Sequence, residues 1–135
     1  MTLGHFVIDS NAALLFALLP LFVKELNINF AQAGALATLL LITSSVTQPL
    51  FGFVHDRQPM FPMSSAGLLL AGLAMGLTGF AMSYGQMVAR VFAAGIGVAA
   101  FHPQAVAQAG HASAGNQEWG IALFFTGGST GTGAM

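Results

Sequence analysis

The chain has 135 residues, of which 56% are hydrophobic and 5% charged, with a net charge of -1 and a mean hydropathy of +0.78. A soluble domain carries about 25% charged residues, so this composition excludes a water-covered surface, and it excludes disorder because disordered segments are poor in apolar residues. There is no basic excess for nucleic acid and no cysteine for disulfide or thiolate chemistry. The composition therefore predicts an integral membrane protein embedded in a lipid bilayer.

Two transmembrane helices are predicted first, at about 3–22 and 31–54. About 20 apolar residues rising 1.5 Å each cross the ~30 Å of bilayer hydrocarbon. No Lys or Arg precedes the first segment and Lys24-Glu25 follows it, which does not resemble a cleaved signal peptide. The second segment ends at a polar step that contains Asp56 and Arg57, and this step predicts the turn of a transmembrane hairpin.

The rest of the chain predicts a third helix at about 61–82, a fourth at 86–108, a polar loop at 110–118 and a fifth helix at 119–135. The fifth segment stops before it can span, which suggests that the chain is cut inside a helix. Strands are disfavoured because the apolar runs are long and lack polar alternation. We therefore predict an all-α, polytopic membrane helix bundle, with four transmembrane helices, the start of a fifth and no second domain.

Small residues at a spacing of four predict close helix contacts, since they let two backbones approach where lipid offers no hydrophobic driving force. The third helix has Gly72 and Gly76 at this spacing, and the fourth has Gly95 and Gly97, each four residues from an alanine. Orientation does not follow from charge, because the few Lys and Arg residues do not favour one side.

Three ionisable residues are predicted at membrane depth, where such residues are functional candidates: Asp9, Arg90 and His102. His5 shares a helix face with Asp9 and is a further relay candidate. Arg90 shares a small-residue stripe with Gln104, as a cavity-lining helix would need, so both are candidates for the cavity wall. With alternating helix directions, Asp9 lies ~9 Å from one surface and Arg90 ~7 Å from the other, so a direct pair is not expected. His102 reaches the depth of Asp9, and we predict an Asp9–His102 contact, direct or through water, as a proton relay.

Simpler interpretations stay open for each of these residues. Asp9 could cap the start of its helix, His102 could serve the backbone that Pro103 interrupts, and Arg90 could extend to the nearby surface. His5 and the two other histidines lie near helix ends or loops, and we expect them to be solvated.

Two motifs are judged to be chance matches. Residues 95–100 match the dinucleotide pattern G-x-G-x-x-A but lie inside an apolar run, without the preceding strand that the motif requires. Residues 127–133 are rich in glycine and look like a phosphate-binding loop. They have no lysine before the Ser or Thr, which that motif requires, so helix packing is the better interpretation. We expect no enzyme activity, no cofactor and no metal, and treat the scattered methionines as core residues.

The sequence Gly52-x-x-x-Asp56-Arg57 resembles the loop signature of the major facilitator superfamily. The resemblance implies close helix contact at the glycine and a conformational latch formed by the acid and the base on the cytoplasmic side. Arg90 followed by Gly95 and Gly97 resembles the fourth-helix pattern of the same family.

The chain is more closely similar to the fosmidomycin-resistance-like branch of drug exporters. The segments that carry this similarity are His5-x-x-x-Asp9-Ser10, Leu18-Leu-Pro20-Leu21, Thr47-Gln48-Pro49-Leu50-Phe51-Gly52, Ala99-Ala-Phe-His-Pro103 and Phe125-Thr-Gly-Gly128. It implies a twelve-helix transporter in two halves, whose remaining helices lie downstream, in a bacterial inner membrane with a cytoplasmic amino end.

The leading functional prediction is the amino-terminal part of a proton-driven transporter that exports small organic compounds by alternating access. One alternative is a complete, small, dimeric four-helix multidrug transporter. Another is a membrane scaffold without transport activity. The sequence does not identify the substrate, the coupling ion, the transport direction or the oligomeric state.

Overall fold

The computed structural model describes residues 1–58, 61–113 and 115–133, and all of its regular structure is helical. Five α-helices follow one another: α1 (Thr2–Glu25), α2 (Phe30–Arg57), α3 (Met63–Gly76), α4 (Tyr84–His111) and α5 (Gln117–Gly133). A 3-10 turn, η1 (Leu77–Phe80), continues α3. Residue 114 of the predicted loop and residues 134 and 135 of the predicted fifth helix lie outside the described part.

Four of these helical segments are long and apolar enough to cross a membrane, with spans at Thr2–Glu25, Phe30–Arg57, Met63–Phe80 and Tyr84–His111. This agrees with the four predicted spans, although α2 continues through Arg57, so the charged pair lies in its last turn. Side chains cap the starts of α2, α4 and α5, the last through Asn116 Oδ1, which accepts the Trp119 N–H at 3.2 Å. Asn29 and Gln32 form a reciprocal capping box at α2, and the Ser83 hydroxyl accepts the backbone N–H of Gln86 at α4, satisfying donors that lack a helical partner.

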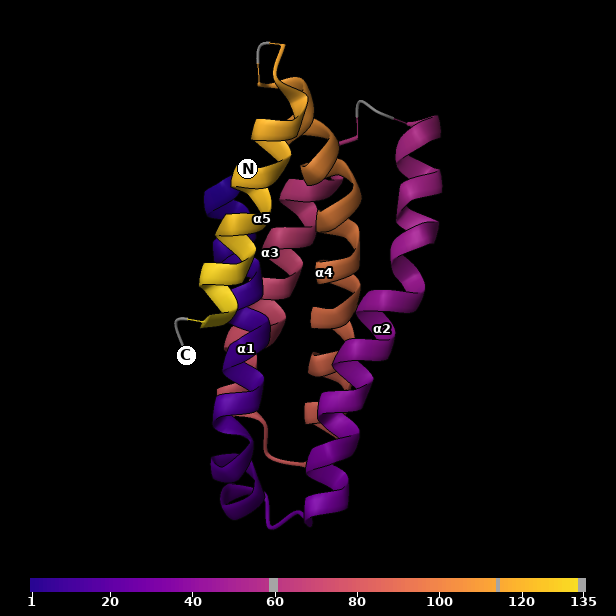
Figure 1. The fold of residues 1–135 in the computed structure, drawn as a ribbon. Coiled ribbons are helices and arrows are strands. Elements are labelled where there is room, and N and C mark those ends of the chain that lie inside the picture. The colour runs from indigo at the N-terminus through magenta and orange to yellow at the C-terminus, as the bar shows by residue number, and fades with distance from the viewer. Residues whose placement is uncertain (59–60, 114, 134–135) are drawn as a thin grey trace.

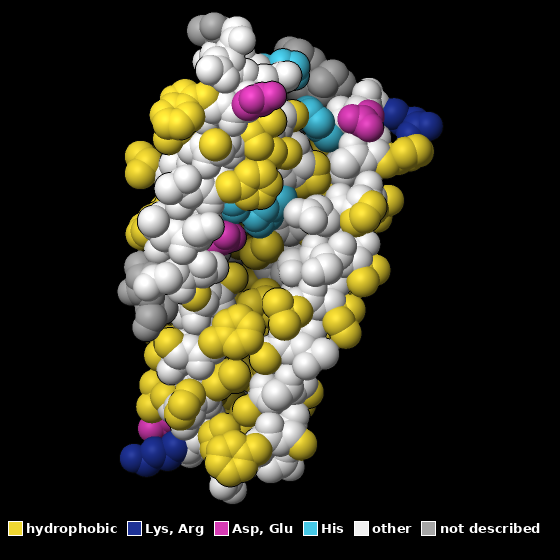
Figure 2. All heavy atoms as spheres, in the orientation of Figure 1, with side chains coloured by type: hydrophobic (Ala, Val, Ile, Leu, Met, Phe, Trp, Pro, Cys, Tyr) yellow, Lys and Arg dark blue, Asp and Glu magenta, His cyan; other side chains and the backbone are white. Residues whose placement is uncertain are grey.

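Helix α4 is central in the bundle, with α3 and α2 packed on it, while α5 packs mainly on α1 (Figure 1). The half of α2 that leads to Arg57 diverges from the other helices. Two apolar cores hold the bundle. One contains Leu15, Leu36 and Val91, and the other contains Ile8, Phe101 and Phe124. Because the outer faces also carry many exposed apolar side chains (Figure 2), the surface suits lipid or further helices.

Several glycines make close helix contacts, but they are only partly the predicted ones. A Cβ on Gly97 would lie 2.5 Å from the backbone nitrogen of Ala71, and a Cβ on Gly95 would lie 2.8 Å from Cβ of Thr43. In the described chain nothing lies within 4 Å of a Cβ placed on Gly72 or Gly76. The α3 glycine that does meet α4 is Gly67, which the spacing rule did not single out.

Candidate functional site

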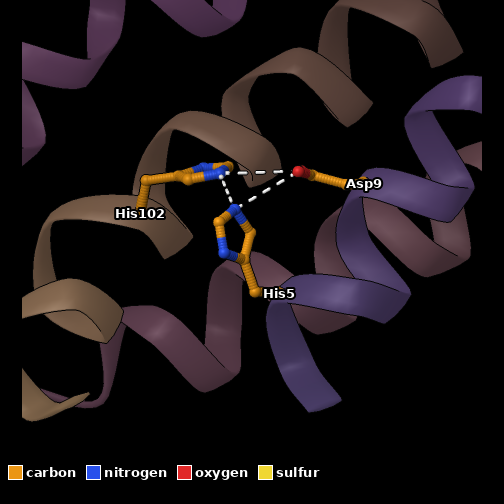
Figure 3. Close-up of side chains that lie close together, drawn as sticks. All are labelled: His5, Asp9 and His102. Atoms are coloured by element: carbon orange, nitrogen blue, oxygen red, sulfur yellow. Dashed lines mark hydrogen bonds and ion pairs between the residues drawn. The ribbon is translucent and has the colours of Figure 1, made fainter. Parts of the chain in front are cut away.

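The predicted polar residues of the first and fourth helices meet in one cluster, formed by His5, Asp9 and His102 (Figure 3). His5 and Asp9 lie one turn apart on α1, with His5 Nε2 3.2 Å from Asp9 Oδ2. His102 comes from α4, and its Nε2 lies 3.6 Å from Asp9 Oδ1 and 3.2 Å from His5 Nε2. The two imidazoles and the carboxylate therefore converge on one small volume.

His5 is buried, with 4% of its surface exposed, so the expectation of a solvated histidine was wrong. Helix α5 covers it: the ring stacks on Phe124 at a centroid distance of 4.0 Å, and Nδ1 lies 2.7 Å from the carbonyl oxygen of Phe124. Since a carbonyl oxygen only accepts, Nδ1 carries the hydrogen and donates it. The contact joins residues 119 positions apart, a separation that leaves no local signal in the sequence.

His102 is held in a similar way by its own helix. Its Nδ1 lies 2.7 Å from the carbonyl oxygen of Val98, so this nitrogen also donates. Pro103 frees the carbonyl of Ala99, but the ring bonds the neighbouring carbonyl instead. Its Nε2 remains directed at Asp9 and His5. A role limited to bonding the backbone near Pro103 therefore does not explain the contacts of this second nitrogen.

Two cavities reach the cluster, each lined by a different one of its residues. The larger, of about 590 Å³, is lined by Asp9 together with residues that include Phe16, Leu41, Ser44 and Thr132. The smaller, of about 290 Å³, is lined by His102 together with Gln48 and Phe125 among others. Figure 2 shows histidine and acidic side chains gathered beside a hollow at mid-height of this face. Asp9 and His102 thus lie on the walls of different cavities while facing each other.

Helix α5 approaches the cluster through a row of glycines. A Cβ on Gly128 would lie 2.5 Å from His5 Nε2 and 2.7 Å from Asp9 Oδ2. A Cβ on Gly127 or Gly131 would lie 2.5 Å from a backbone carbonyl oxygen of α1, and the Ser10 hydroxyl donates to the Gly131 carbonyl at 3.2 Å. The glycine-rich segment therefore lets α1 and α5 touch, as a packing motif would.

Arg90 and Gln104 are not in this cluster. Arg90 Nη1 donates to the carbonyl of Leu77 at 2.6 Å, near the exposed end of α4. Gln104 is 1% exposed; its Oε1 accepts the Ser64 N–H at 2.6 Å and its Nε2 donates to the Phe61 carbonyl at 2.7 Å. Gln104 thereby completes the hydrogen bonds at the start of α3.

The replacement Gln104→Leu is expected to destabilise the protein measurably, because it leaves the buried Ser64 N–H without a partner. It also removes one of two hydrogen bonds to the Phe61 carbonyl, which still accepts the Met63 N–H. A buried donor left unpaired costs about 1–3 kcal/mol. Gln108→Leu, one turn along α4, is the matched control, since the buried Oε1 of Gln108 has no partner among the described residues. Thermal melting of the two variants in detergent checks this, and equal melting temperatures would contradict it.

The predicted latch residues lie at the end of α2. The Arg57 guanidinium carbon lies 3.5 Å from the centre of the Phe53 ring, a cation–π contact. Gly52 faces α4, where a Cβ would lie 3.9 Å from Cβ of Pro103. Asp56 and Arg57 are exposed, and neither forms an ion pair within the described part of the chain. Their latch role stays a prediction.

The cluster also has the composition of a cation site. One ligand atom from each of His5, Asp9 and His102 lies within 4.8 Å of the others, so the three side chains could close around a small cation. The sequence led us to expect no metal.

Comparison with known proteins places the chain in a family. The family model described as "Major Facilitator Superfamily" matches residues 1–135. The chain is 28% identical over 132 residues to "Fosmidomycin resistance protein" of Escherichia coli (strain K12), covering 98% of this chain and 32% of that protein. It is 30% identical over 127 residues to "Uncharacterized MFS-type transporter YfnC" of Bacillus subtilis (strain 168), covering 94% of this chain and 31% of that protein.

The chain thus spans about a third of the length of these curated relatives. No solved structure matches it significantly. Because the family model covers every residue and the helices agree with a membrane transporter, the predicted resemblance is confirmed: the chain belongs to the major facilitator superfamily.

Proposed function

We propose that this chain is the amino-terminal part of a proton-coupled secondary transporter that exports small organic compounds by alternating access. One observation carries the proposal: Asp9 and His102, 3.6 Å apart, lie on the walls of two different cavities. Ionisable groups at membrane depth commonly mark ion pathways. A proton held by this pair can be reached from one cavity and released to the other.

The relay step is a simple proton transfer. A proton leaves Nε2 of His102 for a carboxylate oxygen of Asp9, so the imidazolium becomes neutral and the carboxylate becomes a carboxylic acid. No other bond changes, and the charge of the pair is the same before and after. The transfer therefore moves a proton from the wall of the smaller cavity to the wall of the larger one without creating an unpaired charge in a low-dielectric region.

The larger cavity is the proposed part of the substrate path. Its volume of about 590 Å³ lies in the range of small-molecule sites, which are mostly apolar with a few polar groups. The lining fits this pattern, with Phe16 and Leu41 beside Ser44, Thr132 and Asp9. The name of the Escherichia coli relative suggests fosmidomycin as the first compound to try.

Alternating access would follow from rocking of two halves about this site. Helices α1 and α4 carry the cluster, and α2 ends at Asp56-Arg57, where the latch is proposed. We propose a bacterial inner membrane location with a cytoplasmic amino end, which places this latch and the start of α5 on the cytoplasmic side.

Asp9→Asn in the complete transporter tests the function. We expect the variant to lose the acceleration of fosmidomycin export that a proton gradient gives in reconstituted vesicles, while downhill exchange of the compound continues. Asparagine keeps the size of the side chain but cannot accept the relayed proton. Glu25→Gln, at the far end of α1, is the control and should behave like the parent protein. If proton-driven export continues in the Asp9→Asn variant, the proposed relay is wrong.

A further inference from the structure

The two histidines face each other through nitrogen atoms that both lack hydrogen when the rings are neutral. Each Nδ1 donates to a backbone carbonyl, Phe124 for His5 and Val98 for His102, at 2.7 Å. In a neutral imidazole one nitrogen donates and the other accepts. Each Nε2 therefore presents a lone pair, and the two lone pairs meet across 3.2 Å.

The Asp9 carboxylate adds a third acceptor to the same space. Its oxygens lie 3.2 Å from His5 Nε2 and 3.6 Å from His102 Nε2, and an ionised carboxylate has no hydrogen to donate. With all three groups deprotonated, three acceptors repel one another without a donor between them. Buried polar groups without partners are costly, so the cluster is incomplete as it stands.

One added proton supplies the missing hydrogen-bond donor. It creates an N–H group on one imidazole that can donate to the other imidazole or to the carboxylate, and its positive charge balances the carboxylate. A second proton would place two N–H groups against each other across 3.2 Å and leave a net positive charge at membrane depth, which is costly. The geometry therefore favours a cluster that binds one proton.

No other titratable group among the described residues faces the cluster. Helix α5 presents Phe124, Gly128 and Thr132, and α2 presents Ser44 and Gln48. On α4, the Arg90 side chain is engaged at Leu77. The proton balance therefore concerns His5, Asp9 and His102 alone.

We propose that His5, Asp9 and His102 form one site for a single shared proton, and that the hydrogen bond from His5 to the Phe124 carbonyl makes this site depend on contact between α1 and α5. This deepens the proposed function, on which it rests for its role in transport, by adding His5 as a second proton-binding ring. If α5 moves away from α1, His5 loses the acceptor that holds its hydrogen on Nδ1. Its Nε2 can then take that hydrogen, and the site no longer binds the shared proton well.

Nuclear magnetic resonance of the complete transporter, labelled with 15N at histidine and embedded in lipid nanodiscs, tests the site directly. We expect two of the ring signals, assigned to His5 and His102 by their loss in single replacements, to show Nδ1–H tautomers at high pH. On acidification the two rings should take up one proton between them. Nε2–H tautomers, or two protons taken up independently, would overturn the proposal.

The variant His5→Asn separates the shared proton from mere packing. The Asn amide can still donate to the Phe124 carbonyl but has no Nε2 lone pair opposite His102. We expect the protonation midpoint of His102 to fall by about one pH unit, which is a tenfold loss of proton affinity, while the melting temperature stays close to that of the parent. His111→Asn, at the exposed end of α4, is the control. An unchanged midpoint in His5→Asn would exclude His5 from the site.

These measurements do not depend on transport. If the shared proton is observed but no proton-driven export is found, the proposed function fails and the site stands. If export is proton-driven but the rings titrate independently, the proposed function stands and the shared site fails.

Discussion

Replacing Gly128 by valine is expected to reduce the proposed transport activity of the complete protein to background while the protein still inserts in the membrane. A Cβ at this position would lie 2.5 Å from His5 Nε2 and 2.7 Å from Asp9 Oδ2, closer than atoms can pack. The α5 backbone must therefore move away, or both polar side chains must rotate. Either change breaks the convergence of His5, Asp9 and His102, so the proposed relay and any substrate contact of Asp9 would be lost together.

The size of this effect follows from what surrounds the cluster. Overpacking a buried site costs about 1–3 kcal/mol, which a membrane protein can survive, whereas a displacement of about 1 Å at a functional constellation can cost a hundredfold in rate. Vesicle transport should therefore fall much more than the melting temperature does.

Gly133→Val is the matched control on the same helix, because no described atom lies within 4 Å of a Cβ placed there. It should transport like the parent protein. Normal transport by Gly128→Val would mean that the cluster tolerates a different geometry from the one seen here, and equal losses in both variants would point to a general defect of α5.

The depth of the candidate residues was predictable from the sequence. The rise per residue of a helix is fixed, so counting along two antiparallel helices placed His102 level with Asp9 and separated Arg90 from both. The structure brings His102 Nε2 to 3.6 Å from Asp9 Oδ1. The membrane class and the four spans were predictable for a similar reason, since apolar length reports directly on bilayer thickness.

The lateral arrangement of the helices was not predictable. Small residues occur on several faces of α3, and the spacing rule favoured Gly72 and Gly76, whereas α4 meets the face that carries Gly67. His5 appeared solvated because nothing in its neighbourhood signals that α5 returns to cover it. Gln104 was expected at the cavity, yet it bonds the start of α3. Each of these positions depends on helix rotation, which one sequence does not encode locally.

Gly97→Leu is expected to prevent the first four helices from assembling. A Cβ at Gly97 would lie 2.5 Å from the nitrogen and 2.9 Å from the Cα of Ala71, and 2.7 Å from the carbonyl oxygen of Gly67. These are backbone atoms, so no side-chain rotation relieves the clash, and α3 must separate from α4. Since α3–α4 is the most extensive helix pair in the bundle and such contacts rely on close packing, the cost should exceed the usual 1–3 kcal/mol of overpacking.

The measurement is the yield and melting temperature of monodisperse protein after extraction into a mild detergent. Gly72→Leu adds the same side chain to α3 where no described atom lies within 4 Å of a new Cβ, so it controls for added bulk and hydrophobicity. We expect aggregation or a melting temperature at least 10 °C lower for Gly97→Leu, and near-parent behaviour for Gly72→Leu. If Gly97→Leu instead melts with the parent, then α3 and α4 do not touch at these glycines. The opposite ranking would mean that the Gly72 face makes the essential contact with a protein partner outside the described helices, because lipid alone would not penalise a leucine there.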